Sequence, residues 1–226
     1  MIKIPGYFIS SLIIILALSI FSIWIGSRVK KLKVGDEPGK FVALIIGLID
    51  YINRFVRNNI GKHWRYVAPL VLTLGMYIMI ANISGLFLLD SPTKYVSITF
   101  SLAVFSFIIV QSTGIVSQKW RHVNTWFKPM FFMAPMNILS DITPLISMSL
   151  RLFGNIASGS VLVTLIYRLT GVFSPVVALP FHIIFDIAFG LIQTIVFVFL
   201  TVNFASNKVK NTDFDILKDK GEFTHE

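Results

Sequence analysis

The chain has 226 residues, of which 55% are apolar, and its mean hydropathy is +0.78. This composition is too apolar for one soluble domain and is typical of a membrane protein. The sequence has no cysteine, which excludes disulfides and thiolate metal sites. The net charge of +9 comes from basic residues in the loops between hydrophobic stretches, so it indicates membrane topology rather than nucleic-acid binding.

The first hydrophobic stretch, residues 7–26, carries no charge and suffices for one membrane span at about 1.5 Å per residue. A cleaved signal peptide is the alternative, but no small-x-small cleavage site follows the stretch. Four basic residues come directly after it instead: Arg28, Lys30, Lys31 and Lys33. This pattern favours a retained anchor helix with its N-terminus outside.

The next segment, residues 40–57, is apolar with a polar stripe. The stripe recurs at steps of three, four or seven residues and consists of Lys40, Gly47, Asp50, Arg54 and Arg57. Such spacing predicts an amphipathic helix that lies in the cytoplasmic interface of the membrane. A short helix packed on the rest of the protein is a compatible alternative.

Two further spans are expected at residues 67–89 and 95–116, because both stretches are long and apolar. The tripeptide Asp90-Ser91-Pro92 between them signals a turn. The basic segment that follows, 118–128, contains two tryptophans and suits the headgroup level of a bilayer.

The next apolar stretch, residues 130–169, is longer than one perpendicular span of about twenty residues. We expect Pro129, Pro135 and Pro144 to break its first part into a short re-entrant or interfacial piece. A steeply tilted helix should then run from about 143 to 169. The last long helix is expected at residues 174–205.

The basic residues test this arrangement. With five spans and the N-terminus outside, the inside segments hold nine, three and four Lys or Arg, and the outside keeps three. Sixteen against three is a strong positive-inside bias. We therefore predict an all-α, polytopic membrane protein of about five transmembrane helices plus an interfacial amphipathic helix, with the last two helices long and tilted. The single membrane domain, 1–226, comprises the anchor helix (7–26), the interfacial helix (40–57), the remaining membrane helices (67–205) and a solvated cytoplasmic tail (206–226).

One arginine lies in the middle of the longest apolar stretch, where the other formal charges are Asp141 and Arg168. Arginine stays protonated at any accessible pH, so Arg151 has to be paired or hydrated. Insertion scales put the free-energy cost of an arginine at the centre of a transmembrane helix at roughly 2.5 to 3.5 kcal/mol. On a helix it shares a face with Ser147 and Asn155, one turn away on either side. Snorkelling to the interface, or bonding to a carbonyl, is the structural alternative to a functional role.

A second polar group lies on the predicted last helix. His182, Asp186, Phe189 and Gln193 sit at i, i+4, i+7 and i+11, so three polar side chains share one face of an α-helix. Asp186 and His182 can exchange protons near neutral pH, whereas Arg151 is a fixed charge. The structural alternative for His182 is a core histidine bonded to a carbonyl. The structural alternative for Asp186 is an ion-pair partner of Arg151. Together with Arg151, the group favours an ion pathway.

The peptide SLRLFGN, from Ser149 to Asn155, resembles the signature of the membrane-embedded a subunit of F-type ATP synthases. The resemblance covers residues 64–205 and is faint over the first sixty. It implies a stator subunit of the cell membrane with two half-channels, packed against a rotating ring of c subunits that each carry a membrane carboxylate. Arg151 would then be the counter-charge of that carboxylate and would block direct leakage between the half-channels, while Asn155 would orient either group.

The resemblance also implies roles for other residues. Many family members carry a glutamine on the last helix and an acid or histidine seven residues before it, and here Gln193 and Asp186 occupy these places. The preceding helix commonly has an acid or histidine nine residues after the arginine, but this sequence has Ser160. That departure suggests that Asp186 and His182 provide the titratable chemistry. Asp141 matches a further family pattern and is expected to line the second pathway. Other candidate lining residues are Ser147, Ser160, Asn82 and Gln111. For Asn82 and Gln111, packing or helix–helix hydrogen bonds are an equal explanation.

The resemblance implies that peripheral-stalk b subunits and an extrinsic F1 catalytic head are further partners, and that the subunit is not catalytic alone and needs no cofactor or metal. The alternative function is an independent proton-coupled secondary transporter in which Arg151 binds an anionic substrate. A membrane enzyme is poorly supported, because the sequence shows no metal-ligand cluster, nucleotide loop or nucleophile with a paired base. Protons are favoured over sodium by frequency within the family.

Overall fold

The computed structural model describes residues 6–31, 39–84, 92–118, 134–173, 177, 180–181 and 183–209, and these are almost entirely helical. The long helices are α1 (Gly6–Lys31), α2 (Lys40–Ile60), α3 (Trp64–Ile83), α4 (Val96–Gln118), α6 (Ala134–Thr170) and α8 (Gly190–Ser206). Shorter helical segments are η1 (Gly61–His63), η3 (Pro92–Lys94), η5 (Gly171–Phe173) and η6 (Ile183–Phe189). Within the described residues, five helical stretches are long and apolar enough to cross a membrane. The predicted all-α, polytopic fold is confirmed.

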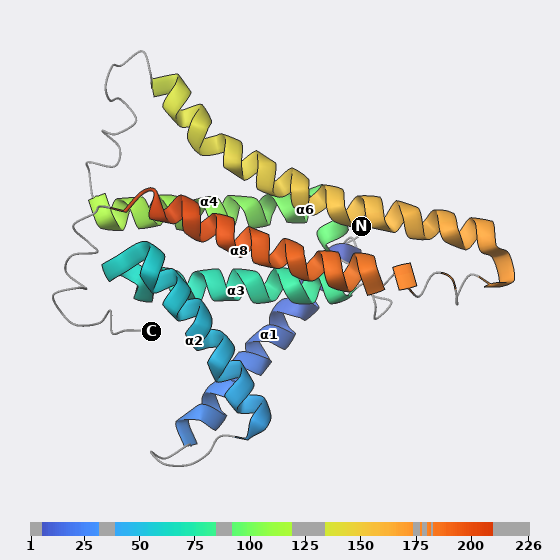
Figure 1. Ribbon diagram of the computed structural model, residues 1–226, viewed down its shortest axis with the longest axis horizontal. Helices are drawn as coiled ribbons and strands as arrows, with labels where there is room; N and C mark the ends of the chain where they lie inside the picture. Colours follow the sequence, from blue (N-terminus) through green and yellow to red (C-terminus); the bar gives the residue numbers. More distant parts are fainter. Residues whose placement is uncertain are drawn as a thin grey trace, which may run out of the picture.

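Helices α3, α4 and α8 form the centre of the molecule. They lie side by side and pack against one another, and α6 crosses this group along α4 and α8 (Figure 1). Helices α1 and α2 leave the group at an angle (Figure 1). The core between these helices is apolar, and its fully or almost fully buried side chains include Val71, Ile78, Ile109, Leu152 and Phe197.

Glycines allow α3 and α8 to approach closely. A Cβ atom on Gly75 would lie 2.8 Å from Cγ2 of Val198, and one on Gly190 would lie 2.9 Å from the Cβ of Asn82. Small residues at such contacts are how helices pack in a bilayer, where burial of apolar surface gives no advantage over contact with lipid. These two close contacts fix α8 against α3.

Helix α2 begins at Lys40 as predicted and runs to Ile60. Its polar stripe includes an exposed ion pair in which Arg54 and Asp50 are 2.9 Å apart. One side of its C-terminal end is buried, since Val56 and Ile60 have no exposed surface. The helix therefore packs on the protein at this end, as one of the two compatible expectations requires, while its place in the membrane interface stays a prediction.

The predicted break at Pro144 is wrong. Helix α6 is continuous from Ala134 to Thr170 with Pro144 inside it, so it begins about nine residues earlier than expected. Proline costs one backbone hydrogen bond and kinks a helix, but neighbouring helices allow this in membrane proteins. Figure 1 shows α6 bending along its length instead of ending. Pro135 lies in the first turn, where its missing N–H costs nothing.

The predicted last helix is not regular. Its described part begins with η6, a π-helical segment from Ile183 to Phe189, and continues as α8. A π-helix bonds i to i+5, so the α-helical spacing that placed positions 182 and 186 on one face with Gln193 does not hold across it. Phe189 is 42% exposed, whereas Gln193 is 3% exposed.

Candidate functional site

Arg151 lies on the outer side of α6, the side that faces away from α4 and α8. Its side chain is exposed, as is that of Ser147 one turn earlier, whereas the intervening Met148 and the next residue, Leu152, are buried. Among the side chains that the structure describes, none pairs with Arg151. The predicted shared face of Ser147 and Arg151 is thus observed, and it points out of the subunit.

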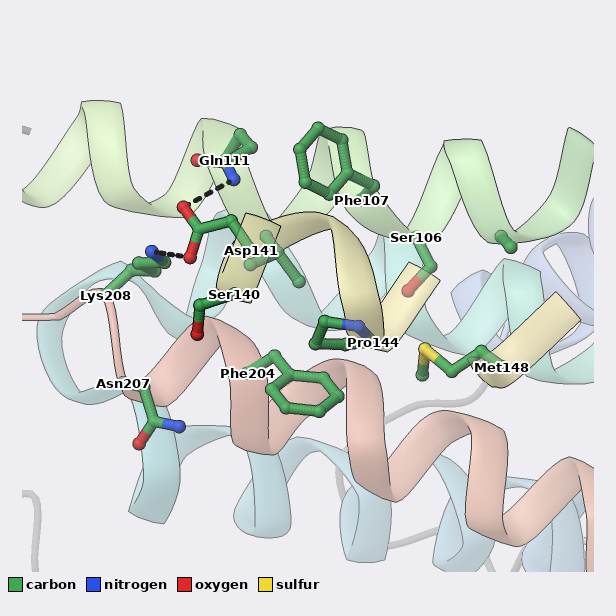
Figure 2. A pocket seen from close by; sticks show the side chains of 12 residues that line it. Ser106, Phe107, Gln111, Ser140, Asp141, Pro144, Met148, Phe204, Asn207 and Lys208 are labelled. Atoms are coloured by element: carbon green, nitrogen blue, oxygen red, sulfur yellow. Dashed lines mark hydrogen bonds and ion pairs between the residues drawn. The ribbon is translucent and has the colours of Figure 1, made fainter. Parts of the chain in front are cut away.

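Asp141 lies ten residues before Arg151 on the same helix but on its inner side. The Nζ atom of Lys208 contacts its Oδ1 at 2.5 Å, and Nε2 of Gln111 donates to its Oδ2 at 3.4 Å. Figure 2 shows the carboxylate between these two side chains, which come from α4 and from the chain just after α8. The side chains of Asp141 and Lys208 are 16% and 21% exposed. The carboxylate therefore has a cationic partner within the subunit.

A cavity of about 260 Å³ runs beside this cluster, between α4, α6 and α8. Asp141, Gln111 and Lys208 line one part of it, and Pro144 and Met148 follow along α6 (Figure 2). Its other lining residues are Ala103, Ser106, Phe107, Val110, Ser140, Phe204 and Asn207. The cavity is large enough for several waters and has polar partners for them. It reaches Met148, which precedes Arg151 by less than one helical turn.

The other predicted site residues are distributed differently. Asn82 donates from Nδ2 to the Gly190 carbonyl at 3.2 Å, one turn before the buried Gln193. Its Oδ1 is buried and has no hydrogen-bond partner among the described residues. Ser160 donates to the Ala157 carbonyl of its own helix at 2.8 Å. His182 and the side chains of Asp186 and Asn155 lie outside the part of the molecule that the structure describes.

The structure adds Lys208 to the site, a residue that the sequence places in a solvated tail. Its partner Asp141 is 67 positions away, and no local pattern relates the two. A lysine directly after a membrane span, when another span carries an acid near the same end, is the one signal that could have suggested the pair.

These features define a class of protein. The chain is an all-helical, multi-pass membrane protein with a polar cavity beside one span and, on the outer side of that span, an arginine that no described side chain pairs, as expected for a protein that conducts ions together with a partner.

Comparison with known proteins specifies the family. Residues 8–206 match the model of the ATP synthase A chain family. The chain is 30% identical over 192 residues to ATP synthase subunit a 2 of Pelobacter propionicus, which covers 84% of this chain and 81% of that protein. It is 32% identical over 164 residues to ATP synthase subunit a 2 of a Bradyrhizobium species, 72% of each chain. It is 28% identical to ATP synthase subunit a of Mycoplasmoides gallisepticum, over 87% of this chain and 75% of that protein.

The chain therefore belongs to the ATP synthase subunit a family, the non-catalytic proton-translocating stator subunits of the membrane sector Fo. The match begins at residue 8, so the similarity extends over the first sixty residues, where the motifs alone are faint.

Proposed function

We propose that this subunit provides two half-channels that pass protons to and from the carboxylates of a rotating c-ring, and that Arg151 blocks direct passage between them. The observation that carries the proposal is the exposure of Arg151, together with the absence of a partner among the described side chains. A permanent charge in a bilayer needs a counter-charge or water, and no described side chain of this subunit supplies a counter-charge. A deprotonated ring carboxylate about 4 Å away would supply about 4 kcal/mol at an effective dielectric of 20.

The cavity beside Asp141 supports one of the two pathways. It ends near the level of Arg151, and its polar side chains can hold a chain of waters. The second pathway is assigned to Asp186 and His182, with Gln193 and Asn82 beside the α3–α8 contact. Protons would leave one pathway for the ring, travel round with it, and enter the other.

The basic residues support an orientation for the cavity. Figure 1 shows the junction of α2 and α3, the end of α4 and the end of α8 at the same end of the molecule. Lys62 and Arg65 lie at that junction, and Lys208 lies after α8. Under the positive-inside rule this end faces the cytoplasm, which puts the N-terminus outside and the Asp141 cavity on the cytoplasmic side. The peripheral-stalk b subunits and the F1 head would bind on this side.

Two serines on α6 offer a matched test. Ser147 is exposed on the Arg151 side, while Ser149 is 4% exposed and lies about 200° round the helix. Because the chain has no native cysteine, Ser147→Cys and Ser149→Cys can each be paired with one cysteine beside the carboxylate of the co-expressed c subunit. Under oxidation we expect the Ser147 variant to crosslink to the ring and the Ser149 variant to stay free.

The reverse pattern, or no crosslink from either position, contradicts the proposal. If neither variant crosslinks and the subunit purifies alone with a substrate flux of its own, Arg151 becomes the anion-binding residue of a secondary transporter.

A further inference from the structure

Lys208 connects three helices of the subunit. Its backbone N–H donates to the Ala205 carbonyl at 3.0 Å, which continues the end of α8. Its carbonyl accepts a hydrogen bond from Nε2 of Gln118, the last residue of α4, at 2.8 Å. Its side chain reaches Asp141 on α6. Two backbone contacts therefore fix the base of this side chain, and only its four-carbon stem has to be ordered to place the ammonium group.

The contacts that Lys208 and Gln111 make with the Asp141 carboxylate differ in strength. The 2.5 Å contact with Lys208 is a charge-assisted hydrogen bond, which is the strong kind. The 3.4 Å contact with Gln111 is long for a hydrogen bond and therefore weak. The orientation of the carboxylate consequently depends on Lys208 more than on Gln111.

The pair also supplies the charge of the cavity. Of the described residues that line it, Asp141 and Lys208 carry the formal charges, and the remaining polar groups are hydroxyls and amides. A proton that enters this cavity meets one anionic group, and Figure 2 shows that group beside the ammonium of Lys208.

We propose that Lys208 is a positioning residue of the proton pathway, and that it holds the Asp141 carboxylate toward the cavity so that protons exchange with it on their way past Met148. This inference rests on the proposed function, because it takes the cavity to be part of a half-channel. Without the ammonium group, the carboxylate loses its short charge-assisted contact and is held toward the cavity less tightly. Proton exchange through the cavity then slows, although the other lining residues are unchanged.

Passive proton conductance is the direct measurement. It can be recorded in membrane vesicles that carry the complete enzyme, after removal of the F1 head, with the amount of assembled Fo determined in the same vesicles. We expect Lys208→Gln to lower the conductance about tenfold at equal assembly, because one charge-assisted contact is lost. Lys208→Arg should retain most of the conductance. The matched control is Lys62→Gln, which removes an exposed lysine at the same end of the molecule.

A charge swap separates positioning from a purely structural ion pair. The double variant Asp141→Lys with Lys208→Asp restores an ion pair but moves the carboxylate to the other chain segment. If the ion pair is purely structural, both assembly and conductance should return in the double variant. The positioning role predicts that assembly returns while conductance stays low.

Three results would overturn the proposal. They are wild-type conductance in Lys208→Gln, recovery of conductance in the charge swap, and loss of assembly in both variants, which would assign the pair to folding. The variant Asp141→Asn tests the underlying pathway separately. If it conducts normally, the assignment of this cavity to a half-channel fails, whatever Lys208 does.

Discussion

The two sides of α6 differ in whether their charged side chains have a partner within the described part of the subunit. On the inner side, Asp141 is held by Lys208 and Gln111, and Leu152 is completely buried. On the outer side, Leu150 is 61% exposed and Arg151 has no partner among the described side chains. Both sides belong to one continuous helix, so the difference does not come from local structure.

Under the proposed function, this difference marks where the subunit ends and its partner begins. A charge that the fold pairs internally belongs to the interior of the subunit, whereas a permanent charge without a partner among the described side chains is available to a group from another chain. The inner side should therefore govern the stability of the isolated subunit, and the outer side should govern coupling to the ring. The predictions below test this division.

The largest effect is expected at Arg151. We predict that Arg151→Ala lowers ATP-driven proton pumping by roughly three orders of magnitude. A lost interaction of about 4 kcal/mol corresponds to that factor, since each 1.36 kcal/mol is tenfold in rate. Pumping can be followed by the quenching of a pH-sensitive dye in inverted vesicles. The level of assembled subunit should stay within error of the wild type, because no described side chain depends on Arg151.

The control for this prediction is Arg151→Lys, which keeps a positive charge but loses the planar fork. It should pump measurably more than Arg151→Ala. Normal pumping by the alanine variant would mean that Arg151 snorkels to the membrane surface, and the division between the two sides of α6 would then carry no functional meaning.

Several features of this division could be predicted from the sequence. The apolar spans, the positive-inside bias and the α6 face shared by Ser147 and Arg151 all follow from period and charge, which are local properties. The SLRLFGN motif indicated the correct family, because few other multi-pass membrane proteins carry an arginine flanked by these residues within a span.

The rest depends on contacts between distant residues. Pro144 was expected to break α6, but packing against α4 and α8 keeps the helix intact. The π-helical segment at Ile183–Phe189 changes which residues share a face, and no α-helical count could show this. The pairing of Lys208 with Asp141 joins residues 67 positions apart, so it required the fold.

A smaller effect is expected from a matched pair of leucines. Leu152→Ala leaves a cavity on the inner side, whereas Leu150→Ala shortens a side chain that faces outward. Lipid is as apolar as leucine, so the transfer part of the usual cost is absent and only the packing part remains. We predict that Leu152→Ala destabilises the isolated subunit by about 1–3 kcal/mol and that Leu150→Ala changes its stability by less than about 0.5 kcal/mol.

Reversible unfolding of the purified subunit in mixed micelles measures both variants. Leu150→Ala should instead reduce the fraction of c-ring that co-purifies with the subunit. Equal destabilisation by the two substitutions would contradict the division, since it would mean that the outer side also packs within the subunit.

The smallest effect is expected at a buried hydroxyl pair next to the inner side of α6. The Ser106 and Thr201 hydroxyls of α4 and α8 are 2.7 Å apart, but Thr201 also donates to the Phe197 carbonyl of its own helix at 2.8 Å. Thr201 keeps that second bond in Ser106→Ala, so loss of the Ser106 hydroxyl leaves it partly satisfied. A double-mutant cycle of Ser106→Ala with Thr201→Val should therefore give a coupling of about 0.6 kcal/mol, the average for such pairs in membrane proteins. The exposed Ser101→Ala on the same helix is the control and should be neutral. A coupling above about 2 kcal/mol would mean that hydrogen bonds, rather than close packing of apolar side chains, hold the inner side together.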